Sequence, residues 1–170
     1  MILDRFFPDL YIPSVYELPL AELKEMGIRG LVFDIDNTIA PFDVAEPDEK
    51  LIQFFQSLKK QGFHLLILSN NNKERVHLFS RKLPALAVHK AGKPSIKKLH
   101  HALSLLHIAP AEAAIIGDQA FTDMWCGNRG GLYSIMTAPI CNRDQLITKV
   151  KRGVERQVMR IYFRQNGIKP

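Results

Sequence analysis

The sequence has few cysteines and no long apolar run, and both shortages narrow the class of protein. Its 170 residues include two cysteines, Cys126 and Cys141, which form no CxxC pair and no disulfide framework, so we expect a reducing, cytoplasmic compartment. The longest apolar runs, such as 65–68, are far shorter than the roughly 20 residues that span a bilayer. Charged Asp4 and Arg5 precede any apolar run, so no secretory signal is expected.

Short apolar runs alternate with segments of helical period, which indicates an α/β fold with a parallel sheet. Nearly continuous apolar composition is typical of strands that helices cover on both faces. The predicted strands are 31–35, 63–68, 86–88, 113–116 and 132–136. The predicted helices are 47–61, 73–82, 95–106 and 122–128, with a short one between Pro19 and Gly27.

The charge is unevenly distributed along the chain. The whole net charge of +6 lies in residues 142–170, and residues 1–141 are neutral overall. We expect an N-terminal segment at 1–30, a catalytic core at 31–141, and at 142–170 a basic helix packed on or beside the core. Its apolar positions are Ile147, Val150, Val154, Val158 and Ile161, and its basic stripe is Lys149, Arg152, Arg156 and Arg160. Such a helix either lies against anionic lipid or packs its apolar stripe on the domain and leaves the basic face solvated.

Polar side chains follow four of the predicted strands at the point where each strand ends. They are, in chain order, Asp34, Asp36 and Thr38; Ser69 and Asn70; Lys90 and Lys93; and Asp118 and Asp123. In an open parallel sheet, ligands bind just beyond the carboxyl ends of the strands. Carboxylates gathered there repel one another unless a cation joins them, and a hard cation such as Mg²⁺ prefers oxygen ligands. A phosphate would then bridge the metal, a lysine and the N–H groups at a helix start.

The order of these motifs resembles the haloacid dehalogenase-like (HAD) superfamily. The motifs are Asp34-x-Asp-x-Thr38, Ser69-Asn70, Lys93-Pro94 and Gly117-Asp-Gln-x-x-Thr-Asp123. The resemblance covers about residues 30–140 and implies a three-layer, Rossmann-like α/β core. About two dozen residues separate Ser69 from Lys93, enough for one helix and one strand. We therefore expect no large cap domain and an open catalytic mouth, which suits large substrates or a lid borrowed from a partner.

The resemblance implies a Mg²⁺-dependent phosphatase that works through an aspartyl-phosphate. Asp34 matches the nucleophile and Asp36 the general acid/base. Lys93 matches the lysine that neutralises the phosphoryl oxygens, and Lys90 is its competitor, although the following proline favours Lys93. The remaining implied roles are phosphate binding by Ser69 and Asn70, Mg²⁺ binding by Asp34, Asp118 and the backbone carbonyl of Asp36, bracing of the loop by Thr38, and support of the site or of a metal-bound water by Asp123.

A finer resemblance concerns the substrate. The segment 117–123 and the N-terminal stretch from Ser14 to Gly30 look like the capless (subclass IIIA), YqeG-type subfamily, related to the phosphatidylglycerophosphate phosphatases of mitochondria and plastids. This implies production of phosphatidylglycerol by a cytoplasmic protein that contacts anionic phospholipid at the inner face of a membrane through residues 142–170. Two alternatives stay open: a phosphatase of a nucleotide, a nucleic-acid end or another soluble phosphoester, and a regulatory binding protein without turnover. Nucleic acid is disfavoured because no aromatic residues interleave the basic stripe. The intact acidic and lysine motifs argue against a vestigial site.

Overall fold

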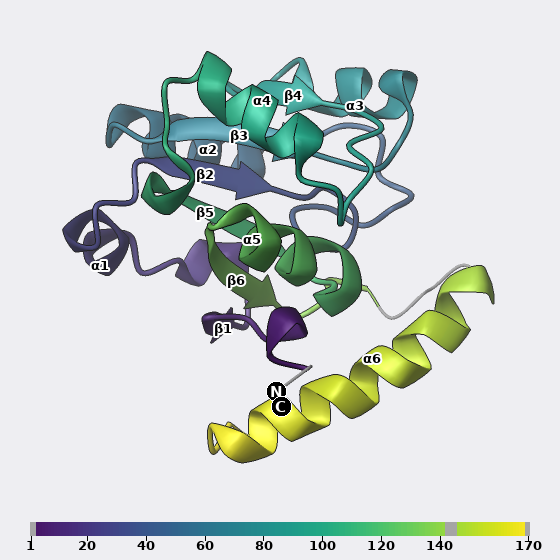
Figure 1. Ribbon diagram of the computed structural model, residues 1–170. Coiled ribbons are helices and arrows are strands. Elements are labelled where there is room, and N and C mark those ends of the chain that lie inside the picture. Colours follow the sequence, from purple (N-terminus) through teal and green to yellow (C-terminus); the bar gives the residue numbers. More distant parts are fainter. Residues whose placement is uncertain (1–2, 142–145, 169–170) are drawn as a thin grey trace.

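The structure is a computed structural model that describes residues 3–141 and 146–168, without the side chains of 146–152. Its centre is a six-stranded, fully parallel sheet in the order β1-β6-β5-β2-β3-β4 (Figure 1). The strands are β1 Leu10–Ile12, β2 Gly30–Phe33, β3 His64–Leu68, β4 Leu86–Val88, β5 Ala113–Gly117 and β6 Tyr133–Thr137. The α-helices are α1 Leu20–Glu25, α2 Glu49–Lys60, α3 Lys73–Ser80, α4 Lys97–Leu105, α5 Trp125–Gly130 and α6 Leu146–Gln165.

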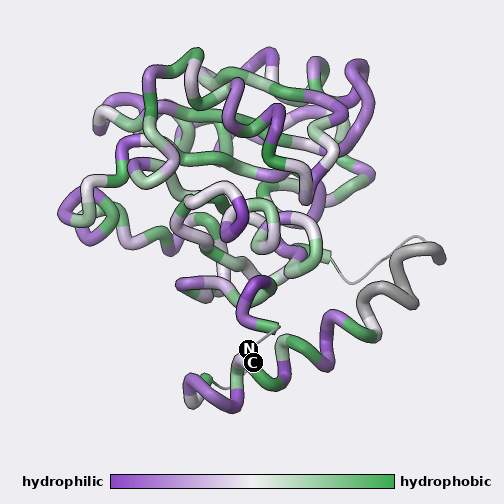
Figure 2. Tube along the Cα trace, in the orientation of Figure 1, coloured by the Kyte–Doolittle hydropathy of each residue, from purple (hydrophilic) through white to green (hydrophobic). Residues whose placement is uncertain are grey.

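Helices cover both faces of the sheet, and the central strand β2 shows why. Its side chains alternate between the faces, as the pleat requires. Leu31 and Phe33 pack in one apolar cluster with residues of α1, α2 and α3, whereas Val32 packs in a second cluster with residues of α4 and α5. Figure 2 shows the hydrophobic segments concentrated in the strands between these helical layers. The predicted three-layer α/β fold is confirmed, and its continuous apolar runs are strands buried on both faces.

Among the described residues, an edge strand and a π-helical turn are elements that were not predicted from the sequence. The N-terminal segment supplies an edge strand, β1, which pairs with β6 in the register Leu10↔Ile135. Just before β1, the Asp9 carboxylate accepts hydrogen bonds from the N–H and the hydroxyl of Ser134 (2.7 and 2.9 Å). The segment expected to be one short helix at 122–128 is instead a π-helical turn, η4 (Ala120–Met124), followed by α5. The three residues of β1 lie between Pro8 and Pro13, and prolines on both sides favour a loop over a strand.

The connections between the strands leave no room for an inserted domain. Between β2 and β3 the structure has one loop and α2, and between β3 and β4 it has α3 and short loops. Because all the strands are parallel, the loops that follow β2, β3, β4 and β5 meet at one edge of the sheet. The polar residues after those strands are therefore brought together.

The C-terminal helix α6 packs beside the sheet. Val158, Met159 and Tyr162 are buried, the last two in a cluster with aromatic residues of the N-terminal segment. Val154 and Ile161 of the expected apolar stripe are 57% and 38% exposed. The described side chains do not include those of the stripe positions Ile147 and Val150 or of the basic residues Lys149 and Arg152. The other two basic residues of the stripe, Arg156 and Arg160, are exposed. Within the described residues no helix is long and apolar enough to cross a bilayer.

The close approach of α5 to the sheet gives a test of the core packing. A Cβ on Gly127 would lie 2.3 Å from Ile115 Cγ2, and a buried, β-branched isoleucine has little freedom to move away. We expect Gly127→Ala to lower the free energy of unfolding by about 1–3 kcal/mol through overpacking, measured by urea denaturation. The control is Gly153→Ala in α6, where a Cβ meets nothing within 4 Å and helix propensity should stabilise the protein by about 0.5–1 kcal/mol. Equal stability of the two variants would contradict the close packing.

Candidate active site

The first two acidic residues lie on the loop that leaves the central strand. Asp34 directly follows β2, and its N–H donates to the carbonyl of Ile116 (3.0 Å), so the ladder to β5 continues to this residue. The chain then turns back at Asn37, whose φ of 61° lies in the left-handed region that asparagine tolerates. The Asn37 N–H donates to the carbonyl of Ala40 (2.7 Å) and closes the turn. This turn keeps Asp34 and Asp36 at the same edge of the sheet.

The Lys93 ammonium is the centre of a buried ion triad. Its Nζ lies 2.6 Å from Asp34 Oδ1 and 2.6 Å from Asp123 Oδ1, and its side chain is 3% exposed. The backbone of Lys93 is bracketed by the Asn70 amide, which accepts from its N–H (2.8 Å) and donates to its carbonyl (3.1 Å). The competing Lys90 is exposed and lies outside the pocket lining described below. The structure therefore brings Lys93, and not Lys90, to the nucleophile candidate.

The electrostatics of the triad follow from burial and charge. Burial raises the pKa of Asp34 to about 7, the Lys93 ammonium opposes this shift, and Asp123 and Asp36 add to it. Burial by itself would lower the pKa of Lys93, but the carboxylates of Asp123 and Asp34 outweigh it and the pKa is raised. Lys93 is therefore a permanent positive charge, a property that favours the binding of an anion next to Asp34.

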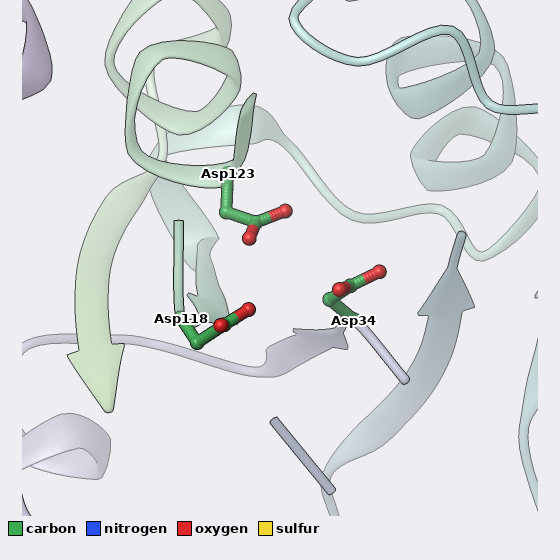
Figure 3. Close-up of side chains that lie close together, drawn as sticks. All are labelled: Asp34, Asp118 and Asp123. Atoms are coloured by element: carbon green, nitrogen blue, oxygen red, sulfur yellow. The ribbon is translucent and has the colours of Figure 1, made fainter. Parts of the chain in front are cut away.

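Three carboxylates converge beside this lysine. Asp34, Asp118 and Asp123 each place an oxygen within 4.8 Å of the others, and Figure 3 shows the three side chains close together. The Thr38 hydroxyl donates to Asp118 Oδ1 (3.4 Å) and so links the loop after β2 to the end of β5. Gly117 makes the approach possible, because a Cβ there would lie 2.4 Å from the Asp123 carboxyl carbon. A set of carboxylate oxygens with one lysine fits a hard divalent cation such as Mg²⁺.

Asp34 and Lys93 face an open pocket of about 340 Å³, whereas Asp118 and Asp123 lie outside its lining. Its lining residues are Asp34, Asp36, Ser69, Asn70, Asn71, Lys93, Gln119 and Thr122. Ser69 is buried, and its Oγ accepts the N–H of Asn71 (3.2 Å). Every residue expected to touch the phosphoryl group thus lines one volume, which is large enough for a phosphate and part of its ester.

Several residues of this site were not assigned roles from the sequence. Asn71, Gln119 and Thr122 line the pocket, and Arg75 contacts Asp36 from the first turns of α3. Asn71 stands next to the expected phosphate-binding pair, so the motif itself offered a signal. Arg75 stands 39 residues from its acidic partner, and only the tertiary fold reveals the pairing.

Comparison with known proteins agrees with this geometry. A family model described as mitochondrial PGP phosphatase matches residues 3–140. A "Probable phosphatase YqeG" of Bacillus subtilis (strain 168) is 33% identical over 99% of this chain and 98% of its own length. The "Phosphatidylglycerophosphate phosphatase 1, chloroplastic/mitochondrial" of Arabidopsis thaliana is 27% identical over 100% of this chain, which spans 52% of that protein.

Solved structures share the fold at low sequence identity. A HAD phosphatase from Thermococcus onnurineus has a TM-score of 0.53 at 14% identity, over 70% of this chain and 90% of that one. The cobalt-bound form of a deoxy-D-mannose-octulosonate 8-phosphate phosphatase from Haemophilus influenzae has a TM-score of 0.52 at 13% identity, over 68% and 81% of the two chains. The resemblance inferred from the motifs is confirmed at the level of family and fold.

The carboxylate cluster predicts metal-dependent stability. A cation held by Asp34 and Asp118 binds only the folded chain, so at a hundredfold excess over its Kd it should add about 2.7 kcal/mol, or roughly 5–10 °C in Tm. We expect Mg²⁺ to give such a shift in a thermal unfolding experiment, and EDTA to reverse it.

Asp118→Asn should abolish the Mg²⁺-dependent shift without lowering the Tm of the metal-free protein, because one source of repulsion is removed. The matched control is Asp43→Asn, which changes an exposed aspartate on the loop after β2 and should keep the shift. A Mg²⁺ shift that survives in Asp118→Asn would place the cation elsewhere.

Proposed function

This chain belongs to the family described as mitochondrial PGP phosphatases and is a HAD-type phosphoric monoester hydrolase. From that premise we propose that it converts phosphatidylglycerophosphate to phosphatidylglycerol, with Mg²⁺ as its cofactor. The observation that carries the chemistry is the pocket where Asp34, Asp36 and Lys93 line one volume. The lipid substrate is supported by the activity for which the Arabidopsis relative is named. It is further supported by a mouth that no inserted segment covers in the described chain.

The first half of the proposed reaction transfers the phosphoryl group to the protein. The phosphate oxygens bind at Lys93 Nζ and the Ser69 hydroxyl, and an Asp34 carboxylate oxygen attacks phosphorus. The bond from phosphorus to the glycerol oxygen breaks, and that oxygen takes a proton from the Asp36 carboxyl group. Phosphatidylglycerol leaves, and Asp34 holds the phosphoryl group as an aspartyl-phosphate.

The second half returns the protein to its starting state. Asp36, now a carboxylate, removes a proton from a water molecule, whose oxygen attacks phosphorus. The bond from phosphorus to the Asp34 oxygen breaks, inorganic phosphate leaves, and Asp36 is again protonated. Bound by Asp34, Asp118 and the backbone carbonyl of Asp36, Mg²⁺ would supply positive charge for the phosphoryl oxygens.

We also propose that α6 contacts anionic phospholipid at the cytoplasmic face of a membrane. The described surface of this helix that faces away from the domain combines exposed Val154 and Ile161 with exposed Arg160 and Arg164. Apolar residues next to arginines are typical of helices that lie in the headgroup region. In Figure 1 the first turns of α6 extend past the edge of the sheet toward which β2 points, the edge that holds the pocket. A surface that binds α6 would therefore lie close to the catalytic mouth.

Asp34→Asn tests the proposed chemistry. The asparagine amide is a far weaker nucleophile, so we expect phosphate release from phosphatidylglycerophosphate in detergent micelles to fall below a hundredth of wild type, with the fold intact by circular dichroism. A panel of soluble phosphoesters is assayed in parallel, and wild type should prefer the lipid. A wild type that acts only on soluble esters would exclude the lipid substrate. A fully active Asp34→Asn would exclude the nucleophile assignment, and no turnover of any ester by wild type would favour a binding protein.

Removing two positive charges from α6 tests the membrane contact. Each basic residue near an anionic bilayer contributes about 1 kcal/mol, so the double variant Arg160→Gln, Arg164→Gln should weaken co-sedimentation with phosphatidylglycerol vesicles about tenfold or more at low salt. Hydrolysis of a soluble ester should stay unchanged. The charge-matched control is Lys59→Gln, Lys60→Gln, which alters exposed lysines of α2. If both double variants lose the same affinity, the contact is a general charge effect and not a property of α6.

A further inference from the structure

Arg75 is a largely buried arginine whose direction is fixed on several sides. It lies in the first turn of α3, where the Asn72 side chain accepts its backbone N–H (2.8 Å) and starts the helix. Its side chain is 14% exposed, and its guanidinium lies over the ring of Phe79, one helical turn later, with 5.2 Å from Cζ to the ring centroid. The guanidinium is therefore held in one orientation, toward the loop that follows β2.

The two terminal nitrogens of Arg75 bind two parts of that loop. Nη2 donates to Asp36 Oδ1 (3.0 Å), and Nη1 donates to the backbone carbonyls of Val44 and Ala45. The second oxygen of the same carboxylate accepts from Asn71 Nδ2 (2.7 Å). Both oxygens of Asp36 are thus held from outside, and the planar guanidinium holds one of them with little loss of side-chain entropy.

Arg75 acts through Asp36 and does not reach the phosphate directly. In the part of the chain that the structure describes, Asp36 and Asn71 line the pocket and Arg75 does not. A second arginine, Arg81, directly follows α3 and pairs with Glu46 of the same loop without contacting Asp36. The buried Arg75 Nε has no hydrogen-bond partner among the described residues, and an unpaired buried donor opposes folding. Holding the loop against α3 therefore does not by itself explain a largely buried arginine at position 75.

We propose that Arg75 is a positioning residue for proton transfer in this site. It fixes the carboxyl group of Asp36 at the angle from which one oxygen reaches the ester oxygen that leaves phosphorus, and later the attacking water. Arg75 itself neither gives nor takes a proton, and it stays charged throughout. This inference rests on the proposed function, in which Asp36 is the general acid and base.

The proposal makes a specific statement about the leaving group. An alkoxide such as the glycerol oxygen needs a proton as it departs, whereas a p-nitrophenolate departs readily without one. Loss of positioning at Asp36 should therefore slow cleavage of the alkyl ester far more than cleavage of the aryl ester. Substrate binding by Lys93 and Ser69 is untouched, so for the alkyl ester, whose first transfer becomes the slow step, KM should change little and kcat should carry the effect.

The test compares kcat/KM for phosphatidylglycerophosphate micelles and for p-nitrophenyl phosphate, because kcat/KM reports the steps up to transfer onto Asp34. In Arg75→Gln we expect roughly a hundredfold loss on the lipid and less than tenfold on the aryl ester, within the usual range of general acid catalysis. Arg75→Lys, which keeps the charge without the fork, should recover part of the lipid activity. Asp36→Asn gives the pattern of losses expected when the proton donor itself is removed. Arg81→Gln is the matched control, because Arg81 contacts the same loop without contacting Asp36, and it should stay within twofold of wild type on both esters.

Each outcome decides a separate point, with folding checked by thermal unfolding. Equal losses on the two esters in Arg75→Gln, beside an unequal loss in Asp36→Asn, would overturn the positioning role and leave the proposed function standing. Equal losses in Asp36→Asn as well would overturn the acid/base assignment, and the positioning role with it. If Arg75→Gln fails to fold, Arg75→Lys decides by the same ratio, and a lysine variant that loses both activities equally overturns the proposal.

Discussion

The fold depends at its functional edge on one electrostatic constraint, which is the repulsion among carboxylates that the sheet forces together. Asp34, Asp118 and Asp123 place oxygens within 4.8 Å of one another, and Asp36 lies on the same loop as Asp34. The Lys93 ammonium offsets part of this repulsion by pairing with two of the carboxylates at 2.6 Å. Arg75 holds the Asp36 carboxyl group outside this cluster, at 3.0 Å. The three clustered carboxylates still outnumber the single ammonium among them, and a divalent cation would balance the excess negative charge.

Much of the surrounding structure serves to keep that lysine in place. The Asn70 side-chain amide makes two hydrogen bonds to the backbone of Lys93. Asn70, which was expected to bind phosphate, therefore also positions this lysine. Gly117 lets the buried Asp123 approach the end of β5. The Gln119 N–H donates to the second oxygen of Asp123 (3.2 Å), so the π-helical turn η4 also fixes this carboxylate. The site is preorganised by backbone and amide contacts before any substrate binds.

The sequence predicted the strands and the acidic site residues for the same physical reason. Runs such as Leu65–Leu68 are apolar because helices cover both faces of the sheet, and the polar residues that follow them mark the edge where ligands bind. The strand β1 was missed because its three residues lie between Pro8 and Pro13, which favour a loop, and η4 because a π-helical turn resembles an α-helix in sequence. Arg75 also escaped, since its partner Asp36 comes from another strand's loop. The catalytic roles rest on motif order, and the geometry supports them.

The uncovered mouth has a consequence for how water is managed. Short connections between β2, β3 and β4 leave the pocket open in the described chain, so the described residues do not by themselves shut solvent out of it. Electrostatic contacts at Lys93 and Asp34 strengthen when water is displaced. The enclosure then has to come from whatever carries the phosphate. A bulky substrate, or the surface in which it is embedded, would cover the pocket and exclude water from it. A small ester would leave the pocket accessible to solvent.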